Sequence, residues 1–409
     1  MTRFSRKQAG SGRNWLRGGL WVLGWLAIAI PIARVQLADL AVVNNMPGQA
    51  LIFDAGQGRG LAGLAVARQL QGEQQDAITL ARAALKREPM NVAALRSLGF
   101  ALEQTGDKNA ANRILFLAGR LGWRDVALQL WLIKTFGLQG NVAAALHRAD
   151  ALARVNRVPE ITSALFMASI KDDQLRAALV QELKDRPNWR GPFFYRLLQL
   201  PANQIGYFEA LVADLAKVGS PINPAERAIY LTRLIQVGKG ADAYRYWLRD
   251  QKTGKTVSTV PWDGGFEHVP PAGTLGAPFE WQMSSESAGV ASIVPSPRGG
   301  QQVTVSPGHD FNGNLMSQTV ILQPGKYTLN TRVLGDPESM GLRWTIQCLP
   351  DHKEVGLATR TSGSELASVT FEIPIGCIAQ SLTLEMSARG DGSGSEDVSV
   401  DDVAIQRNN

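Results

Sequence analysis

A repeat of 34 residues is the feature that most constrains how this chain can fold. From about residue 50 onward, residues of one type recur at this spacing in several columns. The clearest columns are Gly72, Gly106 and Gly140; Ala77, Ala111 and Ala145; and Leu64, Leu98 and Leu132. Columns that share one period predict units that stack along the chain, because each short unit can bury its apolar face only against its neighbours. The sequence therefore predicts an extended helical stack instead of one closed core.

The residues inside each period are typical of a helical hairpin. In LAGLAVARQLQGEQQDAITLARAALKREPMN, Gly72 stands at the turn between two helical patterns and Pro89 follows the second. The next period carries the pair Leu98 and Gly99. This spacing and these residue types resemble the tetratricopeptide repeat, a helix-turn-helix unit of 34 residues. The resemblance implies a solenoid whose concave groove binds a protein partner.

The pattern weakens toward the end of the helical region. The third period has Gln129 where the earlier periods have leucine, and Arg157 where the first period has Pro89. Beyond Pro159 the helical periodicity continues without aligned columns, and we predict that the solenoid covers residues 36–250. Four aromatic residues of this later part could contact a partner, but at helical spacing we expect them in the core: Tyr207, Tyr230, Tyr244 and Trp247.

The first 35 residues have the composition of a membrane-targeting segment. Residues 1–17 contain five basic residues and no acidic one, and residues 18–33 carry no charge. The small pair Ala27 and Ala29 lies inside the apolar run, which is a poor place for signal cleavage. We therefore predict a retained transmembrane helix over residues 18–35. A cleaved signal, which would leave a secreted or periplasmic protein, is the alternative.

The same basic residues predict the orientation of the chain. By the positive-inside rule residues 1–17 are cytoplasmic, and the bulk of this single-pass bacterial inner-membrane protein is periplasmic. These five residues also account for most of the net charge of +6. No basic surface remains for nucleic acid, so nucleic-acid binding is not expected.

Both cysteines of the chain, Cys348 and Cys377, lie in its last quarter. In an oxidising compartment we expect them to form a disulfide. Closing a loop of about 30 residues contributes roughly 3 to 4 kcal/mol in the chain-entropy account of disulfides. Two buried free thiols are the alternative.

The composition changes after Gln251, where glycine, serine and proline become frequent. Seven short runs of alternating or β-branched residues follow: QQVTVS, SQTVILQ, YTLNTRVL, LRWTIQC, VTFEIP, SLTLEM and VSVDDVAI. Such runs predict an antiparallel β-sandwich over residues 262–409, joined to the solenoid by a linker at residues 251–261. The predicted fold is therefore multidomain, with a transmembrane helix, an α-solenoid and a C-terminal β-sandwich.

Three motifs give this last region a family resemblance. They are WDGGFE at residues 262–267, PFEW at residues 278–281 and VDDVAI at residues 400–405. Together they resemble the jelly-roll carbohydrate-binding modules of galactose-binding-like fold. The resemblance implies a structural calcium held by Glu267 with Asp401 or Asp402, whose carboxylates are hard oxygen ligands. Solvated acids at a strand start and a strand end are the alternative, and no other cofactor is expected.

A glycan-binding surface is predicted from strand alternation. In the runs YTLNTRVL and LRWTIQC, the apolar residues share one face and polar residues share the other. The polar residues Asn330, Arg332, Arg343 and Gln347 are expected to line the outer face of a sheet, where a glycan could accept hydrogen bonds from both arginines. The alternative is an ordinary solvent face, since no aromatic residue is expected there for sugar stacking.

No motif in the sequence indicates catalysis. The four histidines stand far apart, without the spacing of a zinc site, and no nucleophile elbow occurs. We therefore expect a protein that is not an enzyme, with a hydrolase that uses a concealed carboxylate pair as the least favoured alternative.

The order of anchor, solenoid and jelly roll resembles an uncharacterised family of bacterial envelope proteins. That resemblance implies a scaffold or adaptor in surface-polysaccharide production or export. Its solenoid would bind a protein partner, its jelly roll a polysaccharide or another envelope component, and its first helix the membrane. A lectin-like protein that uses the solenoid as a stalk is the alternative.

Overall fold

The computed structural model describes residues 11–250, 260–306, 311–338, 340–349, 351–358, 366–387 and 396–408. Most of the predicted cytoplasmic segment and of the predicted linker, residues 1–10 and 251–259, lies outside the described residues. The chain divides into two compact units, residues 1–162 and residues 163–409. Each unit is described by itself.

The first unit begins with the apolar helix α1 (Ser11–Val43), which is 33 residues long. Residues Trp25–Val43 within it are long and apolar enough to cross a membrane, a property that an N-terminal signal sequence shares. At about 1.5 Å per residue, the whole helix extends roughly 50 Å. The apolar N-terminal helix expected from the sequence is confirmed.

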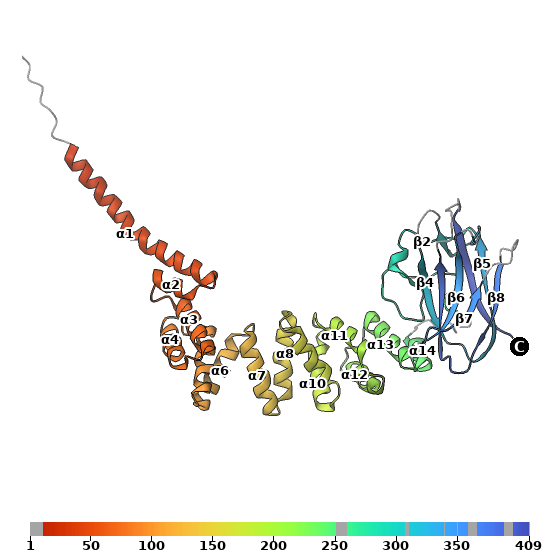
Figure 1. Cartoon of the computed structure of the whole chain (residues 1–409), viewed down its shortest axis with the longest axis horizontal. Helices are drawn as coiled ribbons and strands as arrows, with labels where there is room; N and C mark the ends of the chain where they lie inside the picture. Colours follow the sequence, from red (N-terminus) through yellow and green to blue (C-terminus); the bar gives the residue numbers. More distant parts are fainter. Residues whose placement is uncertain are drawn as a thin grey trace, which may run out of the picture. The chain divides into compact units, whose positions relative to one another are not determined.

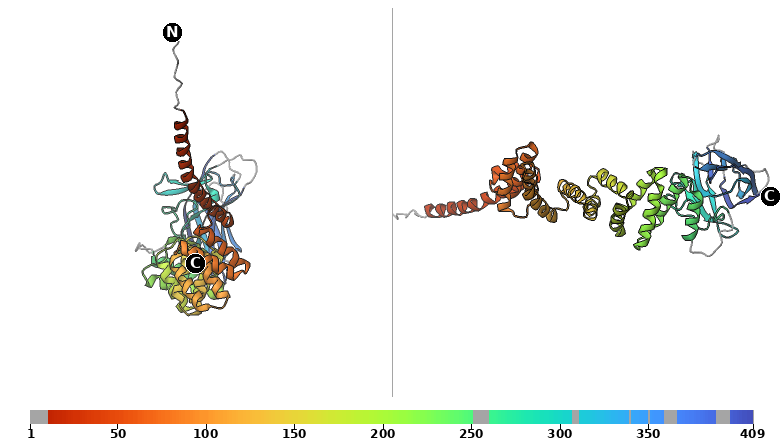
Figure 2. Two further views of the ribbon diagram at one scale, coloured as in Figure 1. Left: turned by 90° about the vertical axis from the view of Figure 1, so that its left-hand side faces the viewer. Right: turned by 90° about the horizontal axis from the view of Figure 1, so that it is seen from below.

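Helical hairpins follow α1 one after another (Figures 1 and 2). Their helices are α2 (Pro47–Phe53), α3 (Gly58–Gln71), α4 (Gln74–Arg87), α5 (Val92–Gln104), α6 (Lys108–Leu121), α7 (Val126–Leu138) and α8 (Val142–Arg154). Helix α9 (Pro159–Ser169) contains the division between the two units. The predicted solenoid of hairpins is confirmed over this unit.

The glycine column of the repeat lies at the tight turn of each hairpin. Gly72, Gly106 and Gly140 have φ angles of 85°, 95° and 73°, a left-handed conformation that side chains with a Cβ disfavour. The next helix follows at once, and the side chains of Asp107 and Asn141 cap α6 and α8. The turn geometry is therefore the physical reason why glycine recurs every 34 residues.

The alanine column lies where the helices pack most closely. Ala77 and Ala111 are fully buried, and Ala145 is nearly so. Small residues let helix backbones approach, and a Cβ on Gly99 would lie only 2.5 Å from Leu115 Cγ. The hairpins of this unit thus pack through alanine and glycine.

The second unit continues with five helices and two short 3-10 turns among its described residues. They are α10 (Asp173–Lys184), α11 (Arg190–Arg196), η1 (Leu197–Gln199), η2 (Ala202–Gln204), α12 (Ile205–Lys217), α13 (Pro224–Gln236) and α14 (Gly240–Asp250). Their core is rich in aromatic rings in mutual contact, including Phe166, Phe193, Phe194, Phe208 and Tyr230. Tyr230 and Trp247 are buried, as expected, whereas Tyr207 is partly exposed.

The C-terminal part of this unit is a sandwich of two antiparallel sheets (Figure 1). One sheet, here called sheet A, has the order β2 (Ala291–Pro295), β3 (Gln301–Val305), β10 (Val398–Arg407), β5 (Gly325–Leu334) and β8 (Leu366–Ile373). The other, sheet B, has the order β1 (Gln282–Met283), β4 (Gly313–Val320), β9 (Ala379–Met386), β6 (Leu342–Leu349) and β7 (Glu354–Ala358). The predicted antiparallel β-sandwich is confirmed.

The core between the sheets is formed by inward side chains of both, together with Phe266 and Trp281 from the segment that precedes β1. Cys348 on β6 and Cys377 before β9 belong to this core and form the expected disulfide. Their Cα atoms are 5.4 Å apart, within the usual range for such a bridge.

The last helix packs directly on the sandwich. Trp247 of α14 is fully buried, and its ring contacts the rings of Phe279 and Trp262. Its Nε1 donates a hydrogen bond to Glu280 Oε1 over 3.0 Å. The indole of a helical residue is thus held by residues of the β region.

Candidate functional site

The four residues predicted to form one glycan-binding face lie in two different sheets. Asn330 and Arg332 are on β5 in sheet A, whereas Arg343 and Gln347 are on β6 in sheet B. The burial of β5 alternates as predicted, so each pair does point away from the core. The prediction of one shared outer face is wrong, because alternation fixes which side of a strand faces out and does not fix which sheet the strand joins.

On sheet B, Arg343 is paired with a carboxylate. Its Nε and Nη2 donate to Glu385 Oε2 on the neighbouring strand β9, over 3.2 and 3.1 Å. The other carboxylate oxygen of Glu385 accepts a hydrogen bond from the Thr345 hydroxyl over 2.8 Å. Gln347 lies opposite Ser381 on the same strand β9. The guanidinium of Arg343 is therefore neutralised within the sheet.

On sheet A, Arg332 is paired in a similar way. Its Nη1 lies 3.0 Å from Asp402 Oδ2. The pairing of β5 with β10 is interrupted between Asp401 and Ala404, and Asp402 has a φ of 52°. An irregularity of this kind re-aims side chains, and here it accompanies the approach of Asp402 to Arg332. Neither predicted arginine offers an uncompensated positive charge to an acidic glycan.

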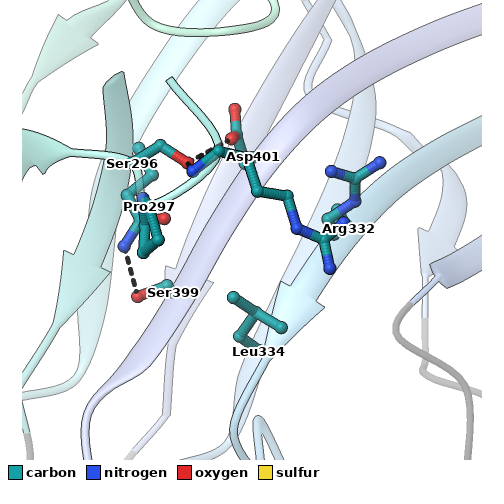
Figure 3. Close-up of a pocket in the computed structure, with 8 residues that line it drawn as sticks. Ser296, Pro297, Arg332, Leu334, Ser399 and Asp401 are labelled. Atoms are coloured by element: carbon teal, nitrogen blue, oxygen red, sulfur yellow. Dashed lines mark hydrogen bonds between the residues drawn. The ribbon is translucent and has the colours of Figure 1, made fainter. Parts of the chain in front are cut away.

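A small polar pocket on sheet A contains two of the predicted site residues. Its lining is Ser296, Pro297, Arg298, Gln302, Arg332, Leu334, Ser399 and Asp401. Figure 3 shows the hydroxyl of Ser296 and the carboxylate of Asp401 joined by a hydrogen bond of 3.3 Å. The Gln302 amide donates to the Ser399 hydroxyl over 3.0 Å. The cavity volume is about 30 Å³, which is the space of about one water molecule and not that of a sugar ring.

Asp401 is the carboxylate whose ionisation is most affected by this pocket. Burial raises its pKa above the ordinary value, and the charge of Asp402 acts in the same direction. The backbone N–H of Asp402, the Ser296 hydroxyl and the charge of Arg332 partly offset that shift. The pocket therefore holds a carboxyl that is harder to ionise than a free one, in contact with donors that its charged form can use.

The three acids predicted to hold calcium have separate partners. Glu267 Oε1 accepts a hydrogen bond from the backbone N–H of Gln301 over 3.1 Å, at the turn between β2 and β3. Asp401 bonds to Ser296 at the other end of that turn, and Asp402 pairs with Arg332. Within the described residues these three carboxylates do not form a group whose oxygens all lie within 4.8 Å of one another. Calcium binding stays a prediction, and any ion there would need further oxygen ligands.

The WDGGFE motif has a structural role that the sequence alone did not reveal. Asp263 accepts hydrogen bonds from the backbone N–H groups of Glu267 and His268, and its carbonyl accepts one from Trp281 Nε1. Gly264 lies directly against the Val403 carbonyl, so a Cβ there would clash with backbone. The motif thus fastens the start of the β region to its last strand.

No family model and no curated protein sequence matches this chain. Among solved structures, similar folds include a carbohydrate-binding module, CBM61, in complex with β-1,4-galactotriose, at 17% identity and a TM-score of 0.24. That match covers 31% of this chain and 88% of the module.

Two further solved structures match parts of this chain. The enzymatically active domain of tailspike protein 4 of bacteriophage CBA120 matches at 14% identity and a TM-score of 0.22, over 29% of this chain and 18% of that one. PilF of Pseudomonas aeruginosa matches at 15% identity and a TM-score of 0.20, over 56% of this chain and 94% of that one. At such low identities and scores, the description of the fold rests on this chain's own helices and strands.

Proposed function

We propose that this chain is a non-enzymatic, membrane-anchored scaffold. Its helical hairpins hold a protein partner, and its sandwich contacts a glycan or another envelope component. The bulk of the chain lies on the periplasmic side of a bacterial inner membrane. There it acts as a scaffold in surface-polysaccharide production or export.

The continuity of helix α1 with the first folded unit carries the membrane-anchored part of this proposal. The end of the apolar helix α1 belongs to the core of the first unit, where Ala38 and Ala41 are buried together with Ala50 of α2. Asp39 also accepts a hydrogen bond from the side chain of Gln57 over 3.0 Å. Cleavage after Ala38 would remove Ala38 from this core, whereas cleavage after Ala33 would leave the core whole. The packing therefore argues against cleavage at Ala38, and the unbroken course of α1 from its apolar run into this core supports a retained helix.

The dimensions of α1 support the same proposal. A hydrocarbon core is about 30 Å thick, and the helix extends about 50 Å, so one end can stand clear of the lipid. Trp21 and Trp25 are 74% and 69% exposed, as aromatic residues at a membrane boundary would be. The Cys348–Cys377 disulfide agrees with an oxidising compartment on the far side.

The partner-binding part rests on the hairpins. Stacked hairpins leave an extended surface, and several apolar residues of the first unit remain exposed on it, including Leu70, Leu117 and Leu138. In the sandwich, the carboxylates that line or flank the polar pocket are engaged by Ser296 and Arg332. That arrangement favours a binding or structural role over general acid–base catalysis.

The experiment uses the full chain in bacterial cells. A topology reporter fused after residue 409 should be active only on the periplasmic side, and the mature chain should keep its N-terminus. A photo-crosslinking residue placed at Leu117 or Leu138 should capture one discrete protein, whereas the same residue at Ile375, which is 94% exposed in the sandwich, should not. A cytosolic reporter signal would overturn the membrane topology. Absence of crosslinks at both helical positions would leave the hairpins as a stalk.

A further inference from the structure

A second and larger cavity lies between helix α13 and sheet B. Its volume is about 300 Å³. Helix α13 contributes Thr232, Ile235 and Gln236, and strand β4 contributes the side chains of Ser317 and Thr319. This volume is at the low end of the range of roughly 300–1,000 Å³ for small-molecule sites, so the pocket suits one compact ligand.

The wall of this pocket is fixed by hydrogen bonds to the segment before β1. The Gln282 side chain accepts a hydrogen bond from the Gly276 N–H over 2.9 Å and donates one to the Ala277 carbonyl over 3.1 Å. The N–H of Thr319 donates to the Pro278 carbonyl over 2.7 Å. The amide of Gln282 is therefore used to shape the pocket, which is largely formed before any ligand arrives.

The helical wall is held in place by the neighbouring helix. Gly240, at the start of α14, lies so close to the sandwich that a Cβ there would be 3.2 Å from Ile321 and 3.3 Å from Ala379. Trp247 of the same helix is enclosed by Phe279 and Trp262. These contacts within the second unit keep α13 against sheet B, so the pocket combines residues of a helix and a sheet.

One part of the pocket lining consists of polar, uncharged side chains. Within the described residues, the hydroxyls of Thr232, Ser317 and Thr319 make no hydrogen bond to protein, so all three are available to a ligand. Among the described residues that line the pocket, His352 is the one histidine and none is Asp, Glu, Lys or Arg. A charged ligand would lose its hydration there without gaining a counter-charge.

Another part of the lining is apolar. Ile235 of α13, Leu275 and Leu349 offer aliphatic surface beside the hydroxyls, and Leu275 is 53% exposed. A ligand matched to this lining has one apolar face and an edge of hydroxyl groups. A pyranose ring has both, since its C–H groups gather on one face and its hydroxyls point outward.

We propose that this pocket binds a single uncharged sugar ring, as the end or a branch of a neutral glycan. The inference rests on the proposed glycan contact of the sandwich and gives it a place and a ligand class. The helix and the sheet each contribute a hydroxyl wall, so the ring contacts both parts of the second unit. The paired arginines of the outer faces have no part in the binding.

The test measures binding of free sugars to the full chain in lipid nanodiscs, because sugar detergents would compete. Saturation-transfer NMR with galactose, glucose, mannose and N-acetylglucosamine should detect at least one ligand, and glucuronate and galacturonate should bind at least tenfold more weakly. The double change Ser317→Ala and Thr319→Val removes two hydroxyls without adding bulk to the pocket. It should raise the Kd of the bound sugar about tenfold, as expected for two neutral hydrogen bonds.

Two further variants test whether the sugar occupies this pocket and not another surface of the chain. Leu275→Trp fills the cavity from its exposed rim and should abolish binding without touching the sandwich core. Thr370→Val, a matched change on β8 in sheet A, should leave the Kd unchanged. Equal binding of neutral and acidic sugars, or a Kd insensitive to Leu275→Trp, would overturn the inference.

The outcome also distinguishes failure of the pocket from failure of the proposed function. If no monosaccharide binds but a glycan array shows binding that Arg332→Ala or Arg343→Ala removes, the pocket inference is wrong and the glycan contact survives. If neither assay detects binding, both the pocket and the glycan contact are wrong, and the scaffold role depends on the crosslinking result alone.

Discussion

The two helical regions of this chain use the same kind of hairpin and pack it in different ways. Helices α3 to α8 pack through alanine and glycine, with Ala77, Ala81 and Ala111 fully buried. Helices α10 to α14 pack through large rings, and Phe208 contacts both Phe194 and Tyr230. Close approach of helix backbones requires small residues at the same positions in every hairpin. Contacts between large aromatic rings depend on the shape of each pair, so their positions differ from one hairpin to the next. This difference explains why the 34-residue period is clear in the first region and absent from the second.

The second region also contains a buried ion pair, and the first region has no equivalent among its described residues. The side chains of Arg190 and Glu226 are each 3% exposed, and Arg190 Nε lies 2.8 Å from Glu226 Oε1. Arg190 also donates to the Leu183 carbonyl and the Ser220 hydroxyl. Glu226 in turn completes the capping box of α13 with Asn223. One polar network thus joins three helices of the second region, whereas in the first region alanine contacts join the helices.

Of the changes considered, breaking this Arg190–Glu226 network should lower stability the most. Arg190→Met leaves the Glu226 carboxylate buried and unpaired, and we expect a loss of about 3 to 5 kcal/mol of local stability. Hydrogen exchange of the α11 to α13 peptides should accelerate, with little change in α3 to α8. The double change Arg190→Met and Glu226→Leu should recover most of the loss. Unchanged exchange in the single variant would contradict the importance of the pair.

Removing the disulfide should destabilise the sandwich and leave the stability of both helical regions unchanged. Replacing Cys348 and Cys377, which are 29 residues apart, with alanine should lower the stability of the sandwich by roughly 3 to 4 kcal/mol. Neither helical region contains a cysteine. Exchange protection should therefore fall in β6 and β9 and stay constant in α3 to α8. Equal loss in all regions would mean that they unfold as one unit.

A methyl group at Gly99 tests the close packing of the first region. A Cβ there would lie 2.5 Å from Leu115 Cγ, and overpacking of this kind costs about 1 to 3 kcal/mol. Gly137→Ala is the matched control, since nothing lies within 4 Å of its Cβ position. That change should stabilise α7 by about 0.5 to 1 kcal/mol through the lower entropy of alanine in the unfolded chain. Thermal melting of the two variants should shift in opposite directions.

The smallest expected effect concerns a partly exposed ion pair of the second region. Hydrogen bonds from Lys217 and Arg176 lower the pKa of Asp214, although burial opposes them. A lowered folded-state pKa stabilises the fold above the ordinary pKa of a carboxyl, about 4, and that stability disappears as the pH falls through the lowered value. Asp214→Asn should remove this acid dependence and cost about 1 kcal/mol or less at neutral pH. Urea titrations of both forms, carried from neutral pH down through the acid range below pH 4, measure it.

Much of the fold could be predicted because the controlling interactions are local. The glycines at left-handed turns and the alanines at close contacts leave a period in the sequence. Seven predicted strand runs correspond to β3, β4, β5, β6, β8, β9 and β10. The strands that were missed, β1, β2 and β7, are short and lie at sheet edges.

The candidate site was harder to predict because it depends on long-range pairing. Strands β5 and β6 are consecutive in the sequence and belong to different sheets, which separates Arg332 from Arg343. Arg190 and Glu226 are 36 residues apart, and no local pattern in the sequence joins them. The pocket between α13 and sheet B combines Thr232 with Ser317 and Thr319, and no sequence pattern joins these positions.

The burial of Trp247 limits which segment of this chain can be transferred to another protein as a module. The indole belongs to α14 by sequence and to the sandwich by contact, since Phe279, Trp262 and Glu280 surround it. A recombination event that joined the β region to another protein within residues 251–259 would remove the Trp247 indole and leave the surrounding residues of the β region exposed. The smallest transplantable module therefore starts at Gly240, and shuffled descendants that lack this helix should need a new aromatic residue in its place.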